Sequence, residues 1–146
     1  MKTKVPVRLD VVAADALDDV VRAEIISLCE SAYGEDFTRL FEELPASVHL
    51  LARDQRGLLV SHAEWVTRWL QPAEHPALRT AYVEAVATAP KQQRQGLATA
   101  LLRRIKDVLA TDSTWELAAL SPSDRSRFLR SRRVGALAGP IGDSTR

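Results

Sequence analysis

The chain has 146 residues, of which 46% are hydrophobic and 27% charged, and this composition is typical of one globular domain. The 20 basic and 19 acidic residues leave a net charge of +1, which excludes the broad positive surface typical of nucleic-acid-binding proteins. The sequence has a single cysteine, Cys29, and shows no apolar run that predicts a signal peptide or a membrane span. We therefore expect a cytoplasmic protein without disulfides and with no nucleic-acid or membrane partner.

The N-terminal part of the sequence predicts one strand followed by two helices. The valine-rich residues 5–13 are typical of a strand. After Asp15, a candidate N-cap, apolar residues recur at helical spacing until Gly34 ends the pattern. A second, shorter helix is predicted over residues 38–44, and Pro45 ends it.

The rest of the sequence predicts four more strands and two more helices. Residues 47–53 and 58–69 are predicted strands whose short connection ends in Gly57, which indicates a hairpin. They are followed by a strand over residues 78–88, a helix with an apolar stripe from Leu97 to Leu109, a strand over residues 115–120 and a helix from about Asp124. This order predicts an α/β fold in which helices flank one central sheet. We expect a single domain over residues 1–133 and an irregular tail over residues 134–146.

The segment between the strand over residues 78–88 and the long helix predicts an anion-binding turn. Gly96 permits a close backbone approach, and Ala98 keeps the first helical turn slim. A helix N-terminus presents unpaired N–H groups with partial positive charge, and Lys91 and Arg94 add full charges, so a pyrophosphate is the expected ligand. The alternative is purely structural, since a glycine before a helix is common.

This segment resembles the acetyl-coenzyme A motif of the GCN5-related N-acetyltransferases, which Gln93, Gly96 and Ala98 match in the expected place after the fourth strand. The resemblance implies a mixed central sheet flanked by helices, acetyl-CoA as co-substrate, and no metal. It also implies that the fourth strand splays from the fifth and that the pantetheine arm of acetyl-CoA lies between them. The residues expected to bind acetyl-CoA are Val86, Ala87, Thr88, Gln93, Arg94, Gln95, Gly96, Leu97, Ala98 and Thr99.

Three shorter matches are similar to aminoglycoside 2'-N-acetyltransferases: the segments at residues 82–87, 36–38 and 119–121. This resemblance implies transfer of an acetyl group from acetyl-CoA to an amine of an aminoglycoside, an activity of the antibiotic-resistance type. Two alternatives stay open, an acetyltransferase that acts on another small amine or a peptide, and a non-catalytic acyl-CoA-binding remnant. A homodimer is also left open.

The resemblance assigns roles to four residues of the substrate site and to one main-chain N–H group. Glu84 is expected to accept a proton from the attacking amine, because a simple amine with a pKa of about 8 is mostly protonated at neutral pH. We expect Glu84 to be buried in its strand, with a raised pKa; the alternative is that it only binds the cationic sugar. Asp36, Ala85 and Ser121 complete the expected substrate site. Asp36 and Ser121 have an alternative role as helix caps. The main-chain N–H near Val86 is expected to hold the developing oxyanion.

Other chemically active residues carry weaker signals. His49, His62 and His75 are far apart in the sequence without metal-ligand spacing, and His62 is interpreted as a strand residue rather than a base. Cys29 falls on the apolar face of the first predicted helix and is expected to be inert.

The C-terminal part departs from the family pattern. Leu129 follows Phe128 where the family has a tyrosine, and the two closing strands of the family are not predicted after it. We therefore expect a C-terminus that is truncated or frameshifted after about Phe128, with impaired activity. The arginines crowded between Arg125 and Arg133 are interpreted as a solvated helix face rather than a nucleic-acid patch.

Overall fold

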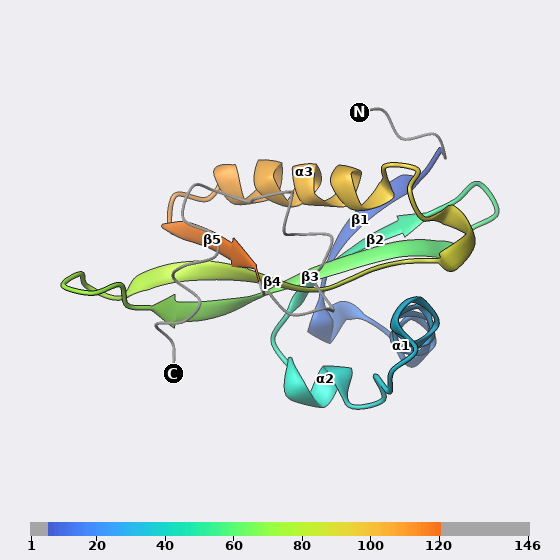
Figure 1. Cartoon of the computed structure of the whole chain (residues 1–146), viewed down its shortest axis with the longest axis horizontal. Coiled ribbons are helices and arrows are strands. Elements are labelled where there is room, and N and C mark those ends of the chain that lie inside the picture. Colours follow the sequence, from blue (N-terminus) through green and yellow to red (C-terminus); the bar gives the residue numbers. More distant parts are fainter. Residues whose placement is uncertain (1–5, 121–146) are drawn as a thin grey trace.

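The computed structural model describes residues 6–120, which form one five-stranded sheet in the order β1-β2-β3-β4-β5. Neighbouring strands are antiparallel except β4 and β5, which are parallel, so the sheet is mixed as expected. The strands are β1 (Arg8–Ala13), β2 (Val48–Arg53), β3 (Leu59–Leu70), β4 (Leu78–Thr88) and β5 (Leu117–Leu120). Long β3 and β4 form a hairpin arm that extends past β5 (Figure 1).

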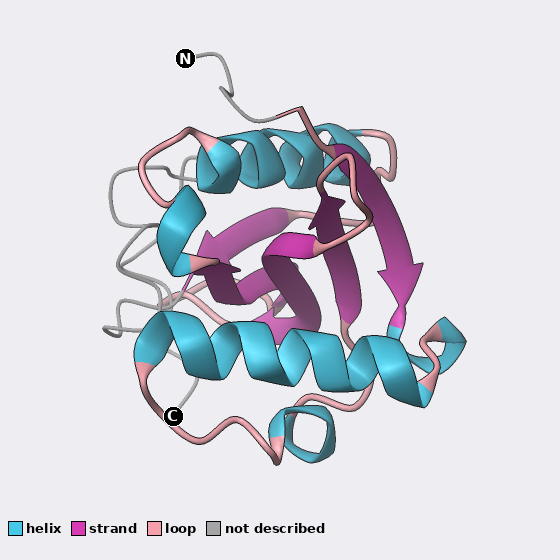
Figure 2. Ribbon diagram, turned by 90° about the vertical axis from the view of Figure 1, so that its right-hand side faces the viewer, coloured by secondary structure: helices cyan, strands magenta, loops and turns pink. Residues whose placement is uncertain are grey.

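Helices cover both faces of the sheet (Figure 2). One face carries α3 (Leu97–Ala110), and the other carries α1 (Asp19–Tyr33) and the short α2 (Leu40–Glu43), as Figure 1 shows. Two 3-10 turns, η1 (Ala14–Ala16) and η2 (Pro90–Gln92), lead into α1 and α3. No helix among residues 6–120 is long and apolar enough to cross a membrane.

The period-two alternation of the strands divides the buried residues into two main cores, because successive side chains point to opposite faces. On the α3 face, the stripe of Leu101, Leu102 and Ile105 packs on sheet residues such as Leu50 and Val83. On the α1 face, the core contains Leu17, Ile25, Leu28, Cys29, Phe37, Leu40, Leu51, Ala85 and Ala87. Cys29 is fully buried there, so the expectation that it lies on the apolar face of α1 is confirmed.

The predicted elements within residues 6–120 are all present, and the differences lie at their ends. The N-cap of α1 is Asp18, whose carboxylate accepts a hydrogen bond from Val21 N at 2.8 Å, whereas Asp15 lies in η1. The prediction of Asp15 as the cap is therefore wrong. Helix α2 is shorter than residues 38–44, because Thr38 belongs to a side-chain-bonded turn that precedes it. The helix expected from Asp124 and the tail over residues 134–146 lie outside the described residues.

Candidate functional site

The turn before α3 has the backbone expected of an anion-binding site. Gly96 is the N-cap with φ 84°, a left-handed conformation that favours glycine, and no side chain caps the helix. Arg94, two residues earlier, is also left-handed at φ 64°. The first turn of α3 contains no acidic residue, while Lys91 and Arg94 precede it, so the positive end of the helix dipole faces a cationic loop.

Gln93 ties this turn to the end of β4. Its side-chain Nε2 donates a hydrogen bond to the Thr88 carbonyl at 3.2 Å. Leu97 is 2% exposed and packs in the core on the α3 face, so only its backbone is available to a ligand. Gln95, Ala98 and Thr99 are half-buried or exposed at the same turn, which brings the predicted loop residues together.

Strand β4 contains a bulge in the middle of the predicted site. Glu84 pairs with Glu64 of β3 and Ala87 pairs with His62, so two residues of β4 oppose one residue of β3. Within the bulge Ala85 adopts φ 52°, which is uncommon for a residue with a Cβ atom and occurs often at functional sites.

Side chains from two neighbouring elements hold the carbonyl groups around the bulge. The Tyr33 hydroxyl at the end of α1 donates a hydrogen bond to the Val86 carbonyl. Ser61 Oγ donates to the Ala87 carbonyl at 3.0 Å. The residues expected to contact the pantetheine arm therefore lie on a strand segment that the protein itself holds in place.

Glu84 is more accessible than the sequence predicts. Its side chain is 25% exposed and forms an ion pair with Arg68, with 3.0 Å between Oε2 and NH2. The expectation that Glu84 is buried is wrong: its carboxylate reaches solvent beside Arg68, whereas Glu64, which pairs with it on β3, is 0% exposed. The accessible carboxylate can reach a bound molecule directly, and Arg68 lies where it can exchange with a cationic amine.

Asp36 lies in the loop between α1 and α2. Its Oδ1 accepts hydrogen bonds from Thr38 N at 2.8 Å and from Thr38 Oγ1 at 2.7 Å, and these bonds lower the pKa of Asp36. Asp36 is exposed, and the N-cap of α2 is Arg39, so Asp36 stabilises a turn rather than capping the helix. Ser121, the arginines from Arg125 to Arg133 and the expected break after Phe128 lie outside the described residues.

The structure also brings together three buried side chains that the sequence analysis did not combine. His49 of β2, His62 of β3 and Glu64 of β3 are each 0% exposed. His49 Nδ1 lies 2.8 Å from His62 Nε2, and both atoms lie within 3.8 Å of Glu64 Oε1. His62 is a strand residue as expected, and it meets His49 although the two histidines are far apart in the sequence.

The signal for this cluster was present in the predicted hairpin. His49 pairs with Glu64 across the β2–β3 ladder, and residues that face each other there point to the same side of the sheet. His62 lies two residues before Glu64 on the same strand and shares that face. Burial raises the pKa of Glu64 to about 8.

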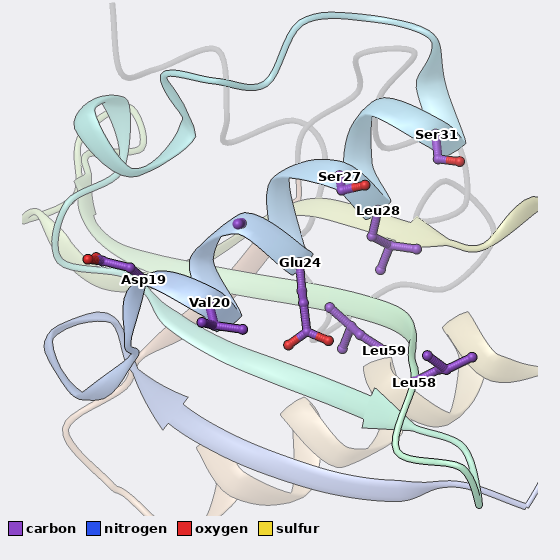
Figure 3. A pocket seen from close by; sticks show the side chains of 9 residues that line it. Asp19, Val20, Glu24, Ser27, Leu28, Ser31, Leu58 and Leu59 are labelled. Atoms are coloured by element: carbon purple, nitrogen blue, oxygen red, sulfur yellow. The ribbon is translucent and has the colours of Figure 1, made fainter.

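An open groove lies apart from the predicted site. It runs between α1 and the β2–β3 turn (Figure 3). Its lining includes the acidic side chains of Asp19 and Glu24 and the apolar side chains of Leu58 and Leu59. No residue expected to bind acetyl-CoA or substrate lines this groove.

The chain belongs to the acetyltransferase (GNAT) family, whose model matches residues 18–129. The match includes β4, the turn at Gly96 and α3, so the family assignment and the observed fold agree.

Individual relatives extend this comparison. An aminoglycoside 2'-N-acetyltransferase from Mycolicibacterium fortuitum is 44% identical over 71 residues, which cover 49% of this chain and 35% of the relative. The matched segment thus spans about a third of that protein.

Two solved structures share the fold at lower identity. The ribosomal-protein-alanine N-acetyltransferase from Brucella melitensis is 20% identical with a TM-score of 0.62, over 90% of this chain and 92% of that one. The aminoglycoside N-acetyltransferase AAC(6')-Iy, solved in complex with CoA, is 13% identical with a TM-score of 0.61, over 89% and 87%.

Proposed function

We propose that the protein is an acetyl-CoA-dependent N-acetyltransferase that acetylates an amine of an aminoglycoside. The observation that carries the proposal is the uncapped, glycine-started N-terminus of α3 directly after the bulged strand β4. The partial identity to an aminoglycoside 2'-N-acetyltransferase supports the substrate class.

The donor would bind along the turn and the strand that precedes it. The N–H groups in the first turn of α3, with Lys91 and Arg94, would hold the pyrophosphate. Acetyl-CoA supplies an acetyl group activated as a thioester. The segment from Val86 to Thr88 would orient the pantetheine arm, and the main-chain N–H near Val86 would hold the negative charge that develops on the thioester oxygen.

The attacking amine has to lose a proton, and Glu84 is the candidate acceptor. Its carboxylate is accessible on the same strand as the bulge, within three residues of Ala87. A positioned base of this kind contributes about 100-fold to 10,000-fold in rate. Arg68 would move aside as the ammonium group of the substrate approaches, since both are cations and compete for the same carboxylate.

The remaining substrate contacts involve the α1–α2 loop. Asp36 is exposed and its carboxylate keeps a negative charge at neutral pH, because hydrogen bonds from Thr38 lower its pKa. It would attract a second ammonium group of the aminoglycoside. Ala85 and Ser121 complete the proposed substrate site.

The test is a thiol-release assay with acetyl-CoA and a panel of acceptors. The panel contains an aminoglycoside with a 2'-amine, a matched aminoglycoside with a hydroxyl at that position, a simple primary amine and a short peptide. We expect release only with aminoglycosides, and faster release with the 2'-amine. Release with the simple amine or the peptide alone would contradict the proposed substrate class, and no release with any acceptor would contradict the activity.

A further inference from the structure

The buried cluster of His49, His62 and Glu64 has a hydrogen-bond pattern that the proposed transfer reaction does not use. The three side chains lie on the face of the sheet that α1 and α2 cover, where the His49 ring packs on Phe41 of α2 at 5.2 Å between ring centres. Neither oxygen of the Glu64 carboxylate has a hydrogen-bond partner among the described residues. An unpartnered buried carboxylate costs stability unless a cation or a donor compensates it.

The outer hydrogen bonds of the two rings bear on which ring nitrogens carry protons. His62 Nδ1 lies 2.9 Å from the Ala85 carbonyl, which can only accept, so Nδ1 is the donor. Ser47 Oγ lies 3.0 Å from the Leu44 carbonyl and 2.8 Å from His49 Nε2; when its one hydrogen goes to the carbonyl, Nε2 donates to the hydroxyl oxygen and Nδ1 carries the lone pair.

Each neutral ring then turns a lone pair inward. These lone pairs, on His49 Nδ1 and His62 Nε2, face each other at 2.8 Å next to the carboxylate of Glu64. In this tautomer the two lone pairs repel, and a metal cation between the nitrogens would remove the repulsion; in the other tautomer His49 Nδ1 donates a hydrogen bond to His62 Nε2.

The separations of the three inner atoms fit a small divalent cation. The two nitrogens are 2.8 Å apart, and they lie 3.7 Å and 3.8 Å from Glu64 Oε1. A point equally far from three atoms with these separations lies about 2.0 Å from each, close to the Zn–N and Zn–O distances of about 2.0–2.2 Å. The second oxygen of Glu64 is also unpartnered and can complete the coordination as a bidentate ligand.

We propose that His49 Nδ1, His62 Nε2 and the Glu64 carboxylate form a buried site for a divalent transition metal, with zinc as the reference ion. Two imidazoles and one carboxylate are a donor set that zinc accepts, whereas magnesium and calcium prefer oxygen ligands. The outer hydrogen bonds to the Ala85 carbonyl and Ser47 Oγ are the second shell that usually orients metal-binding histidines.

The proposed metal site would connect strands β2, β3 and β4 next to the bulge in β4. The ligands come from β2 and β3, and the His62 ring reaches β4 through the carbonyl of bulge residue Ala85. A bound metal would hold three strands together below the bulge. Because all three ligands are fully buried, the ion would enter during folding rather than by diffusion into the folded protein.

The test uses the full untagged chain, unfolded in denaturant with a chelator and refolded with or without zinc chloride. After dialysis against metal-free buffer we expect about one zinc per chain by mass spectrometry, and a higher unfolding temperature for the zinc-refolded sample. Cobalt in place of zinc is expected to give the strong visible absorption of a low-coordinate site with nitrogen and oxygen ligands.

Matched variants separate this site from adventitious binding. Glu64→Gln keeps the shape of the side chain but removes the charged ligand, and it should lower zinc affinity at least 10-fold. His75→Ala removes an exposed histidine outside the cluster and should leave the stoichiometry unchanged.

The proposal is overturned by a wild-type chain that retains no zinc after refolding, or by a Glu64→Gln chain that retains as much as wild type. If Glu64→Gln does not fold, the cobalt spectrum of the wild type decides. A spectrum of hexaaqua-like cobalt contradicts the site, and NMR detection of one proton shared by two imidazoles in the zinc-treated wild type would assign the cluster to a proton instead.

Discussion

The two faces of the sheet are built from different chemistry. Under α3 the buried cluster consists of apolar side chains, among them Leu50, Val83, Leu101 and Ile105, each 0% exposed. The face under α1 and α2 also has an apolar core, but next to it lie the fully buried His49, His62 and Glu64. Glu84, the candidate base, lies opposite Glu64 on the neighbouring strand.

This difference separates stability from chemistry within one domain. Apolar packing is insensitive to pH and contributes by the area that it removes from water. Buried polar groups contribute little net stability and are costly when unpartnered, so a fold that keeps them has another use for them. The candidate base Glu84 and the proposed metal site lie at the α1 face near the bulge in β4, whereas the proposed pyrophosphate site lies at the N-terminus of α3.

The largest effect is expected from breaking the apolar face. Leu101→Ala removes a fully buried side chain of α3 and should lower the free energy of unfolding by about 2–5 kcal/mol, because it leaves a cavity in a packed core. Urea denaturation measures the change. Leu58→Ala, at a residue that is 51% exposed, should change it by less than about 0.5 kcal/mol. Equal losses in the two variants would contradict the assigned core.

Removing the candidate base should affect turnover more than the binding of acetyl-CoA. Glu84→Gln should lower kcat for aminoglycoside acetylation about 100-fold, while the Kd for acetyl-CoA stays within about twofold. Steady-state kinetics and calorimetry provide the two numbers. Glu42→Gln, which removes an exposed carboxylate of α2, is the control and should leave both unchanged. An unchanged kcat in Glu84→Gln would contradict the role of Glu84 as the base.

The donor site depends on positive charge near the N-terminus of α3. Arg94→Glu should weaken acetyl-CoA binding about 10-fold, because it places a negative charge next to the pyrophosphate. Arg103→Glu makes the same charge change on an exposed residue farther along the helix and should have a much smaller effect. Equal effects would indicate that only the net charge of the protein matters.

Asp36 distinguishes charge from local geometry. The substitution Asp36→Asn keeps a side-chain oxygen that can accept the hydrogen bonds from Thr38 but removes the negative charge. Asp36→Asn should raise the KM for an aminoglycoside about fivefold without changing the unfolding temperature, since an exposed ion pair is worth about 1 kcal/mol or less. A lower unfolding temperature with an unchanged KM would mean that Asp36 stabilises the turn but does not bind the substrate.

The smallest effect concerns an ion pair on the α1 face. Arg53 donates to both oxygens of Glu24 at 2.8 Å and 3.0 Å, and this hydrogen bonding lowers the pKa of Glu24 below its value of 4.5 in the unfolded chain. The stabilisation is therefore present above pH 4.5 and disappears as the pH falls through the pKa in the folded state. Glu24→Gln should cost less than about 1 kcal/mol at pH 7.

Denaturation at pH 7 and at about pH 3 measures this pH dependence. The difference between wild type and Glu24→Gln should shrink at the lower pH, because the Glu24 carboxylate takes up a proton as the pH falls. A difference that grows as the pH falls would have the wrong sign for this assignment.

The sequence predicts the elements well where periodicity is strong. Strand β4 begins and ends at the predicted residues, and the stripe from Leu97 to Leu109 forms α3. The ends are less predictable where two residues of one type compete: Asp15 and Asp18 are both candidate caps of α1, and the backbone selects Asp18 because Asp15 lies in η1.

The donor-binding turn could be predicted from the sequence, whereas the side-chain contacts across the strands could not. Gly96 and its neighbours form a local motif, so the turn could be expected from consecutive residues. The ion pair of Glu84 with Arg68 and the contact of His49 with His62 depend on strand register. This register is shifted by two bulges, one between Ala52 and Arg53 and one at Ala85. Residues far apart in the sequence meet through this register, and spacing along the chain does not report it.

The most direct test of the account is a crystal structure of the protein with acetyl-CoA. The account predicts that the pyrophosphate oxygens lie within hydrogen-bonding distance of the N–H groups in the first turn of α3, at Gly96, with the thioester next to the β4 bulge. A pyrophosphate bound anywhere else, including the groove between α1 and the β2–β3 turn, would contradict it.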